Sequence, residues 1–199
     1  MELPTTPQPT TQPPAADGDG RRTAGRVKSA LVLVAFLAIS FGVAALGSIA
    51  TAGNVDGWYA DADKAFWNPP NWVFGPAWTL LYTLMSVAAW LVWRKRRSED
   101  WPVGLRSTSA AVRRALGLYV AQLVLNAIWT PVFFGLYPTI GPAALWIALA
   151  IILALDIAVL LTMLAFWRVS KVAAWLLVPY WAWVLYATTL NAALALLNS

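Results

Sequence analysis

Three stretches of the sequence combine an amide or phenol side chain with an indole at helical spacing. Residues three, four, seven or eleven positions apart share one face of an α-helix. Such a face offers ring stacking and a few hydrogen bonds, which suits noncovalent binding of a flat organic molecule. It also suits hydrogen bonding between helices, and the sequence leaves both interpretations open. The three faces are Trp78, Tyr82, Met85 and Ala89; Gln122, Asn126, Trp129 and Phe133; and Tyr180, Trp183, Ala187 and Asn191.

Acid–base and metal chemistry have few candidate residues. The 199-residue chain contains no His and no Cys. This removes the commonest general base, the thiolate nucleophile and the usual side-chain ligands of zinc and haem iron. No catalytic triad or carboxylate pair stands out either. We therefore expect no metal site, no obligatory cofactor and no dedicated catalytic residue.

The elements that carry these faces are predicted to be membrane helices. The chain is 60% hydrophobic and only 12% charged, whereas soluble domains are roughly 25% charged. About 20 apolar residues in a helix span the hydrocarbon core of a bilayer. We predict an all-α bundle of five transmembrane helices at 29–52, 72–93, 115–136, 142–167 and 172–197, forming one domain over 29–199 after a disordered Pro- and Thr-rich tail at 1–28. The first run is longer than the apolar region of a signal peptide, so we expect it to be retained.

The basic residues predict the orientation of the bundle. They precede the first span or lie between spans two and three or four and five; the exception is Lys64, which lies with Asp56, Asp61 and Asp63 in the first loop. By the positive-inside rule the N-terminus is cytoplasmic and the first loop is outside. We expect a multi-pass protein of a bacterial plasma membrane. The basic loops therefore need no nucleic acid to explain them.

An ordered set of further motifs extends over residues 29–199. It comprises Trp58-Tyr59, Lys64, Trp67-Asn68-Pro69-Pro70, Trp72-Val73-Phe74, Trp78, Tyr82, Gln122, Asn126, Trp129, Pro131, Phe133-Phe134-Gly135, Pro179-Tyr180, Ala182-Trp183, Ala187 and Leu190-Asn191. In its types and order this pattern resembles the family of tryptophan-rich sensory proteins and peripheral benzodiazepine receptors, also called translocator proteins.

The resemblance implies a five-helix homodimer that binds porphyrins, notably protoporphyrin IX, or other flat hydrophobic molecules in a pocket under the first loop. It implies no residue for metal binding. Trp78 and Trp183 match positions implicated in porphyrin breakdown, so any catalytic role would fall to them. The ligand-binding residues that it implies are Trp67, Asn68, Trp72, Trp78, Tyr82, Gln122, Asn126, Trp129, Phe133, Tyr180, Ala182 and Trp183.

Three functions stay open on these grounds. We expect a membrane sensor or transporter that binds tetrapyrroles. The alternatives are an enzyme that degrades porphyrin with light or oxygen, and a translocator of lipids or drugs. Animal members of the family also bind cholesterol through a Tyr followed by a basic residue late in the last helix. Residues 191–199 contain neither, so cholesterol binding is not expected here.

Two features inside the spans predict contacts between helices. Asp156 lies near the middle of the fourth span, and a carboxylate there is costly unless it is neutralised or paired. It either forms a hydrogen bond to a neighbouring helix or takes part in proton coupling or ligand contact. Gly117 and Ala121 form a pair of small residues that permits close helix packing. We therefore expect the homodimer to form through the third span.

Overall fold

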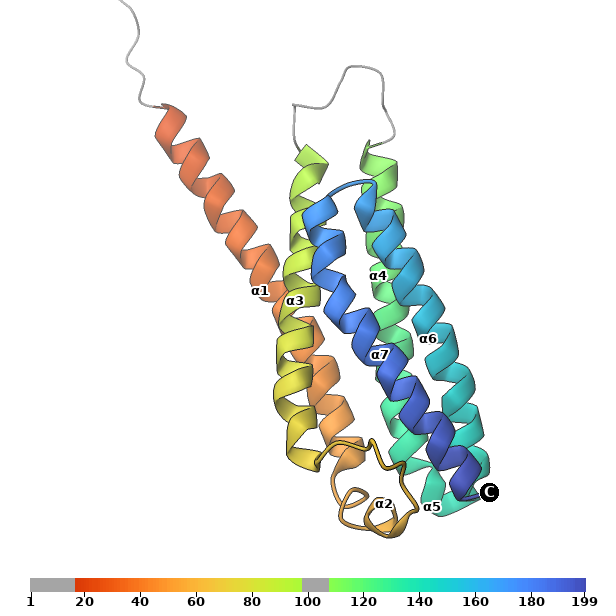
Figure 1. Ribbon diagram of the computed structural model, residues 1–199. Coiled ribbons are helices and arrows are strands. Elements are labelled where there is room, and N and C mark those ends of the chain that lie inside the picture. The colour runs from red at the N-terminus through yellow and green to blue at the C-terminus, as the bar shows by residue number, and fades with distance from the viewer. Residues whose placement is uncertain (1–16, 98–107) are drawn as a thin grey trace, which may run out of the picture.

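The computed structural model describes residues 17–97 and 108–199, and its regular structure in these ranges is entirely helical (Figure 1). Within these ranges, five helical segments are long and apolar enough to cross a membrane. The prediction of an all-α, five-span membrane protein is therefore confirmed. The long helices are α1 (Asp17–Thr51), α3 (Phe74–Arg94), α4 (Thr108–Thr130), α6 (Ala143–Trp167) and α7 (Lys171–Leu197).

Short helical turns lie at the ends of the long helices. A 3-10 turn, η1 (Asn71–Val73), leads into α3, and a second, η2 (Lys95–Arg97), follows it. A π-helical turn, η3 (Pro131–Gly135), extends α4. The short helices α2 (Trp58–Asp61) and α5 (Tyr137–Ile140) lie at the same end of the bundle, where α2 belongs to the first loop (Figure 1).

Two boundaries differ from the sequence prediction. Residues 17–28, expected in a disordered tail, continue α1 without interruption; the stretch lacks proline and contains Ala, Arg and Lys, which favour helix. Residues 1–16 of that tail lie outside the described part of the chain. The third span is predicted at 115–136, but α4 starts at Thr108 and its α-helical part ends at Thr130. Pro131 has no N–H for the carbonyl of Ala127, so the regular ladder breaks there.

The long helices form a closed ring around the interior. α3 packs against α1 and α7, α6 packs against α7 and α4, and α4 also contacts α1. In Figure 1 the N-terminal half of α1 leans away from the other helices. A Cβ placed on Gly47 would lie 3.4 Å from Thr130 Cγ2. A methyl group there would make an ordinary contact, whereas a larger side chain would push the second half of α1 away from the end of α4.

Polar side chains within the spans turn inward and bond between helices, as expected in a bilayer. Ser40 Oγ lies 2.9 Å from Ser86 Oγ and 3.0 Å from the hydroxyl of Tyr119, which joins α1, α3 and α4. Asp156, on α6, is buried, and its Oδ2 accepts a hydrogen bond of 2.8 Å from Thr188 Oγ1 on α7. The expected bond from Asp156 to a neighbouring helix is therefore confirmed.

Basic side chains gather at the end of the bundle opposite α2 and α5. Three of them lie over indole rings: the guanidinium of Arg94 is 4.7 Å from Trp90, that of Arg96 is 5.0 Å from Trp93, and the Lys171 ammonium is 5.7 Å from Trp167. Indoles at a membrane surface beneath cations are typical of an interface belt. The loop that carries Asp56, Asp61 and Asp63 lies at the other end (Figure 1).

Candidate functional site

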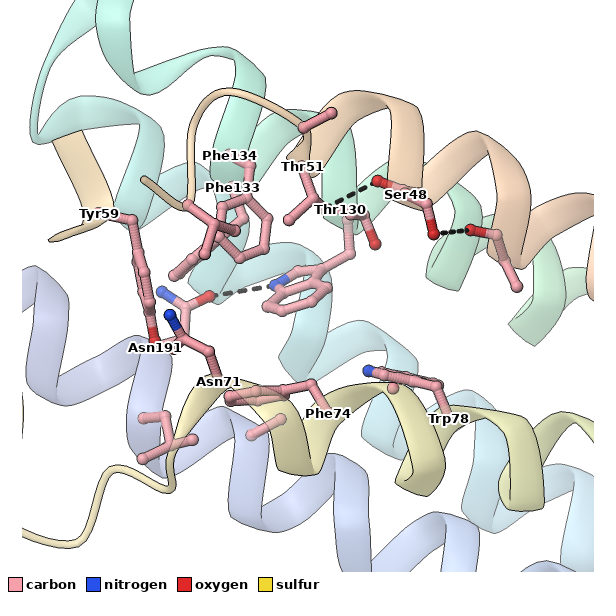
Figure 2. Close-up of a pocket in the computed structure, with 18 of the residues that line it drawn as sticks. Ser48, Thr51, Tyr59, Asn71, Phe74, Trp78, Thr130, Phe133, Phe134 and Asn191 are labelled. Atoms are coloured by element: carbon pink, nitrogen blue, oxygen red, sulfur yellow. Dashed lines mark hydrogen bonds between the residues drawn. The ribbon is translucent and has the colours of Figure 1, made fainter. Parts of the chain in front are cut away.

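A cavity of about 510 Å³ lies inside the bundle at the end covered by the first loop. Its walls come from α1, α3, the end of α4 with η3, and α7, and the loop after α1 covers it (Figure 2). We call it the inner pocket. Its volume falls within the range of roughly 300–1,000 Å³ that is usual for small-molecule sites.

The wall from α1 is built from small side chains at helical spacing. Ala44, Gly47, Ser48 and Thr51 face the inner pocket together with Phe41. The hydroxyl of Ser48 donates to the carbonyl of Ala44 at 3.0 Å, and that of Thr51 to the carbonyl of Gly47 at 2.8 Å. Their hydroxyl hydrogens are thus engaged within the helix, and the small residues leave room for a ligand on this side.

Aromatic rings line the other walls. Trp78 stacks on Tyr82 with ring centroids 5.3 Å apart, and Trp129 stacks on Phe133 at 5.1 Å. Trp183 lies edge-on to Phe74 at 6.0 Å, which closes the wall between α7 and α3. Aromatic pairs at these separations are favourable and hold each other's orientation. The inner pocket therefore offers flat apolar faces on several sides.

The indoles of the inner pocket differ in how they are held. Nε1 of Trp129 donates to Asn191 Oδ1 at 3.1 Å, and Asn191 Nδ2 donates to the carbonyl of Leu145 at 2.9 Å (Figure 2). This fixes Trp129 between α4, α7 and α6. By contrast, Nε1 of Trp183 is buried and has no hydrogen-bond partner among the described residues.

A chain of polar side chains lies behind the aromatic wall. The hydroxyl of Tyr82 donates to Asn126 Oδ1 at 2.7 Å, and Asn126 Nδ2 donates to the hydroxyl of Tyr180 at 3.3 Å. The Tyr180 hydroxyl donates in turn to Gln122 Oε1 at 2.8 Å. All four residues are buried. These hydrogen bonds join α3, α4 and α7. The two amides therefore bond between helices, which is one of the two interpretations that the sequence left open.

The first loop is anchored over the inner pocket by Trp58. Its ring stacks on Tyr137 at 3.9 Å, and its Nε1 donates to the carbonyl of Phe134 at 3.0 Å. Phe134 belongs to the π-helical turn η3, where the regular pattern of backbone bonds is altered. Tyr59 lines the pocket and donates to Asn68 Oδ1 at 3.2 Å. Burial raises the pKa of Tyr59, so its phenol stays protonated as a donor at neutral pH.

The same loop is also fastened to α7. The side-chain amide of Asn198, just after α7, pairs with the backbone of Asp63: Oδ1 accepts from the Asp63 N–H at 3.0 Å, and Nδ2 donates to its carbonyl at 2.9 Å. The Tyr186 hydroxyl donates to the carbonyl of Trp67 at 2.7 Å, and Trp67 Nε1 donates to Thr189 Oγ1 at 3.3 Å. These bonds hold the loop closed over the pocket.

The structure separates the sequence-predicted ligand residues into three groups. Five line the inner pocket: Trp78, Tyr82, Trp129, Phe133 and Trp183. Gln122, Asn126 and Tyr180 lie buried behind its wall. Trp67, Asn68, Trp72 and Ala182 are not part of its lining; Trp72 is 74% exposed, and Ala182 lies in a separate groove between α3 and α7.

The resemblance implied that the first helix borders the pocket, but the sequence analysis named none of its residues as ligand-binding, nor Tyr59, Phe74, Val55 or Asp56. The spacing of small residues at Ala44, Gly47, Ser48 and Thr51 was the available signal. This signal was weak because apolar residues lie on every side of α1, so no single face of the helix is marked by polarity. Asn191, which shares a predicted helical face with Trp183, does line the pocket.

Comparison with known proteins agrees with this architecture. Residues 34–197 match the model of the TspO/MBR family. The chain is 41% identical over 167 residues to the tryptophan-rich protein TspO of Archaeoglobus fulgidus, covering 84% of this chain and 94% of that one. It is 40% identical to the tryptophan-rich sensory protein of Cereibacter sphaeroides (75% and 84% covered) and 40% identical to the human translocator protein (67% and 70% covered). The chain is thus an integral, multi-pass membrane protein that belongs to the TspO/MBR family.

Proposed function

We propose that this chain binds a tetrapyrrole of the protoporphyrin IX type in the inner pocket and acts as a membrane sensor or transporter. The names of the relatives, tryptophan-rich sensory protein and translocator protein, support the sensor or transporter role. The proposal rests above all on one observation, a pocket of about 510 Å³ that is lined by flat aromatic faces from several helices.

The binding mode follows from the chemistry of the lining. A large flat ring system gains affinity from burial of apolar surface and from stacking on indole and phenyl rings. The sequence has no His and no Cys, so the affinity does not require ligation of a central metal. Asn71 lines the inner pocket at its loop end, where the polar edge of a ligand would be placed.

Binding of protoporphyrin IX to protein in nanodiscs, in the dark, tests this function. We expect saturation at ~1 porphyrin per chain, because pockets of this kind are few per protein. Empty nanodiscs measure the porphyrin that simply dissolves in lipid. Uptake that grows linearly and equally in both samples would contradict the proposal.

The assembly is proposed to be a homodimer through α4. Gly117, Val120, Ala121, Val124 and Ile128 lie on one outward stripe of this helix and are exposed. A Cβ on Gly117 would meet nothing within 4 Å, so the stripe has room to receive a second copy. Native mass spectrometry from mild detergent tests this, and Gly117→Leu should shift the mass from dimer to monomer.

The membrane is proposed to be a bacterial plasma membrane, with the N-terminus on the cytoplasmic side. The clustering of basic side chains at one end of the bundle supports this orientation. A cysteine added near residue 64, in a chain that has no other cysteine, should react with an impermeant reagent in intact cells. Reaction only after lysis would contradict the orientation.

A further inference from the structure

We propose that the ligand of the inner pocket enters and leaves sideways from the hydrocarbon layer, through the seam between α3 and α7 that the Trp183 indole closes. This inference rests on the proposed function, because it concerns the route of the same ligand. It assigns Trp183 the role of a gate between the inner pocket and a shallow groove on the outer surface.

The seam carries an apolar groove on its outer side. The groove has a volume of about 340 Å³ and is lined by Ala77, Leu80 and Leu81 on α3 and by Pro179, Ala182, Trp183 and Tyr186 on α7. Trp183 also lines the inner pocket. One indole therefore forms a wall common to the outer groove and the inner pocket.

The groove lies at the depth of the lipid tails. Trp183 is 12 residues from Lys171 and 14 from Leu197, the two ends of α7. At about 1.5 Å per residue these distances are roughly 18 and 21 Å, which places Trp183 near mid-membrane. The apolar macrocycle of a tetrapyrrole partitions into this layer while its acidic edge stays near the headgroups, and the apolar lining of the groove suits the macrocycle.

The Trp183 ring can turn without breaking a hydrogen bond. Its buried Nε1 has no acceptor among the described residues, and its ring contacts are with Phe74 at 6.0 Å and Tyr186 at 5.7 Å. By comparison, the indoles of Trp129 and Trp58 donate to Asn191 Oδ1 and to the carbonyl of Phe134. Rotation of either of those rings would break a hydrogen bond, which opposes the movement.

The surroundings of the ring also favour its movement. Ala77 and Ala182 contribute only a methyl group each to the groove. Pro179 stands one turn before Trp183 inside α7 and cannot donate to the carbonyl of Trp175. A helix bends most readily at a proline that interrupts its backbone hydrogen bonds.

The opposite route, through the first loop, is closed by several hydrogen bonds. Breaking it open would separate Asp63 from Asn198, Tyr186 from the Trp67 carbonyl, and Trp58 from the Phe134 carbonyl. The seam between α3 and α7, by contrast, is closed by one ring whose Nε1 makes no hydrogen bond to a described residue. A ligand already dissolved in the bilayer would also avoid passage through water.

Stopped-flow kinetics of protoporphyrin IX binding in nanodiscs test the entrance. Ala77→Phe fills the groove from α3 without adding to the inner pocket lining, and Leu80→Trp is a second variant of the same kind. Leu185→Phe is the matched control, because Leu185 is exposed on α7 and lines neither cavity. Circular dichroism and thermal unfolding confirm that each variant is folded.

A blocked route slows entry and exit equally. We expect association and dissociation rate constants to fall together by ~10-fold in both groove variants, with an unchanged Kd and an unaffected control. Asn198→Ala, which loosens the loop, should leave both rates unchanged. Unaltered rates in the groove variants, faster rates in Asn198→Ala, or a weaker Kd without slower association would each overturn the side entrance. Loss of saturable binding in the wild type would instead refute the proposed function.

Discussion

The hydroxyl of Tyr82 lies 2.7 Å from Asn126 Oδ1, and the ring that carries this hydroxyl forms the stacking surface for Trp78. A residue of the pocket wall is thereby fixed by a polar chain that continues to Tyr180 and Gln122. The two interpretations of the sequence pattern, bonding between helices and lining a pocket, are both realised in one layer of side chains.

Removing the Tyr180 hydroxyl should destabilise the bundle more than removing that of Tyr82. The Tyr180 hydroxyl accepts a hydrogen bond from Asn126 and donates one to Gln122, whereas the Tyr82 hydroxyl makes a single hydrogen bond. Interhelical hydrogen bonds average ~0.6 kcal/mol, with a maximum near 1.7. We expect Tyr82→Phe to cost about the average and Tyr180→Phe about twice that in unfolding free energy in detergent. Tyr137→Phe is the control, because its hydroxyl has no bond to a described residue; equal losses in all three variants would contradict the polar chain.

Asp156 is expected to act through α7 packing and not through the ligand. It lies outside the lining of the inner pocket and accepts from Thr188. Asp156→Asn keeps an acceptor for Thr188 and removes the ionisable group. Ligand affinity should therefore follow the same profile from pH 5 to 8 as in the wild type, within ~2-fold, since no pocket charge has changed. A displaced pH profile in the variant would show that Asp156 couples protons to binding.

Gly47 is expected to set the width of the inner pocket on its α1 side. Its position opposite Thr130 leaves space for one methyl group, because an added Cβ would lie 3.4 Å from Cγ2 of Thr130. Gly47→Ala should preserve binding of protoporphyrin IX. Gly47→Leu should separate α1 from α4 and weaken binding by ~10-fold or more, as overpacking costs about 1–3 kcal/mol. Equal affinity of both variants for protoporphyrin IX, measured in nanodiscs, would show that α1 does not form part of the binding site.

The pairing of Asn198 with Asp63 is expected to control the opening of the first loop. Asn198→Ala removes both bonds to the Asp63 backbone, each worth about 0.5–1.5 kcal/mol. Hydrogen–deuterium exchange of residues 53–70 should accelerate, while exchange within α6 stays unchanged. Asn198→Asp keeps one acceptor and should give an intermediate rate. Unchanged loop exchange in Asn198→Ala would show that Trp58 alone holds the loop.

The sequence predicted the spans and the inward faces of three helices because each signal is local. Trp78, Trp129 and Trp183 share helical faces with polar residues, and all three line the inner pocket. The loop contacts could not be predicted in this way, since Asn198 and Asp63 are 135 positions apart. Trp67 belongs to this loop, and the path of the loop over α7 decides where its ring lies. Ala182 lies on the outer groove and not in the lining of the inner pocket, because one helical step separates it from Trp183.

Illumination should separate binding from breakdown of the porphyrin. A binding protein leaves bound protoporphyrin IX intact in the dark, and any photochemical loss stops near one equivalent per chain. A degrading enzyme would consume several equivalents, and Trp78→Phe with Trp183→Phe would abolish this turnover if those indoles take part. Absorbance of the porphyrin over time, with and without protein, measures the difference.

The most direct test of the central claim is the Kd of protoporphyrin IX in the dark, from quenching of tryptophan fluorescence, for the wild type and the Trp78→Phe/Trp183→Phe double variant. The control is Trp146→Phe/Trp175→Phe, because these indoles are exposed and line no part of the inner pocket. If the inner pocket holds the ligand, the first variant raises Kd by ~10-fold, about 1.4 kcal/mol, and the control leaves it unchanged. Equal Kd values in all three proteins would contradict binding in the inner pocket.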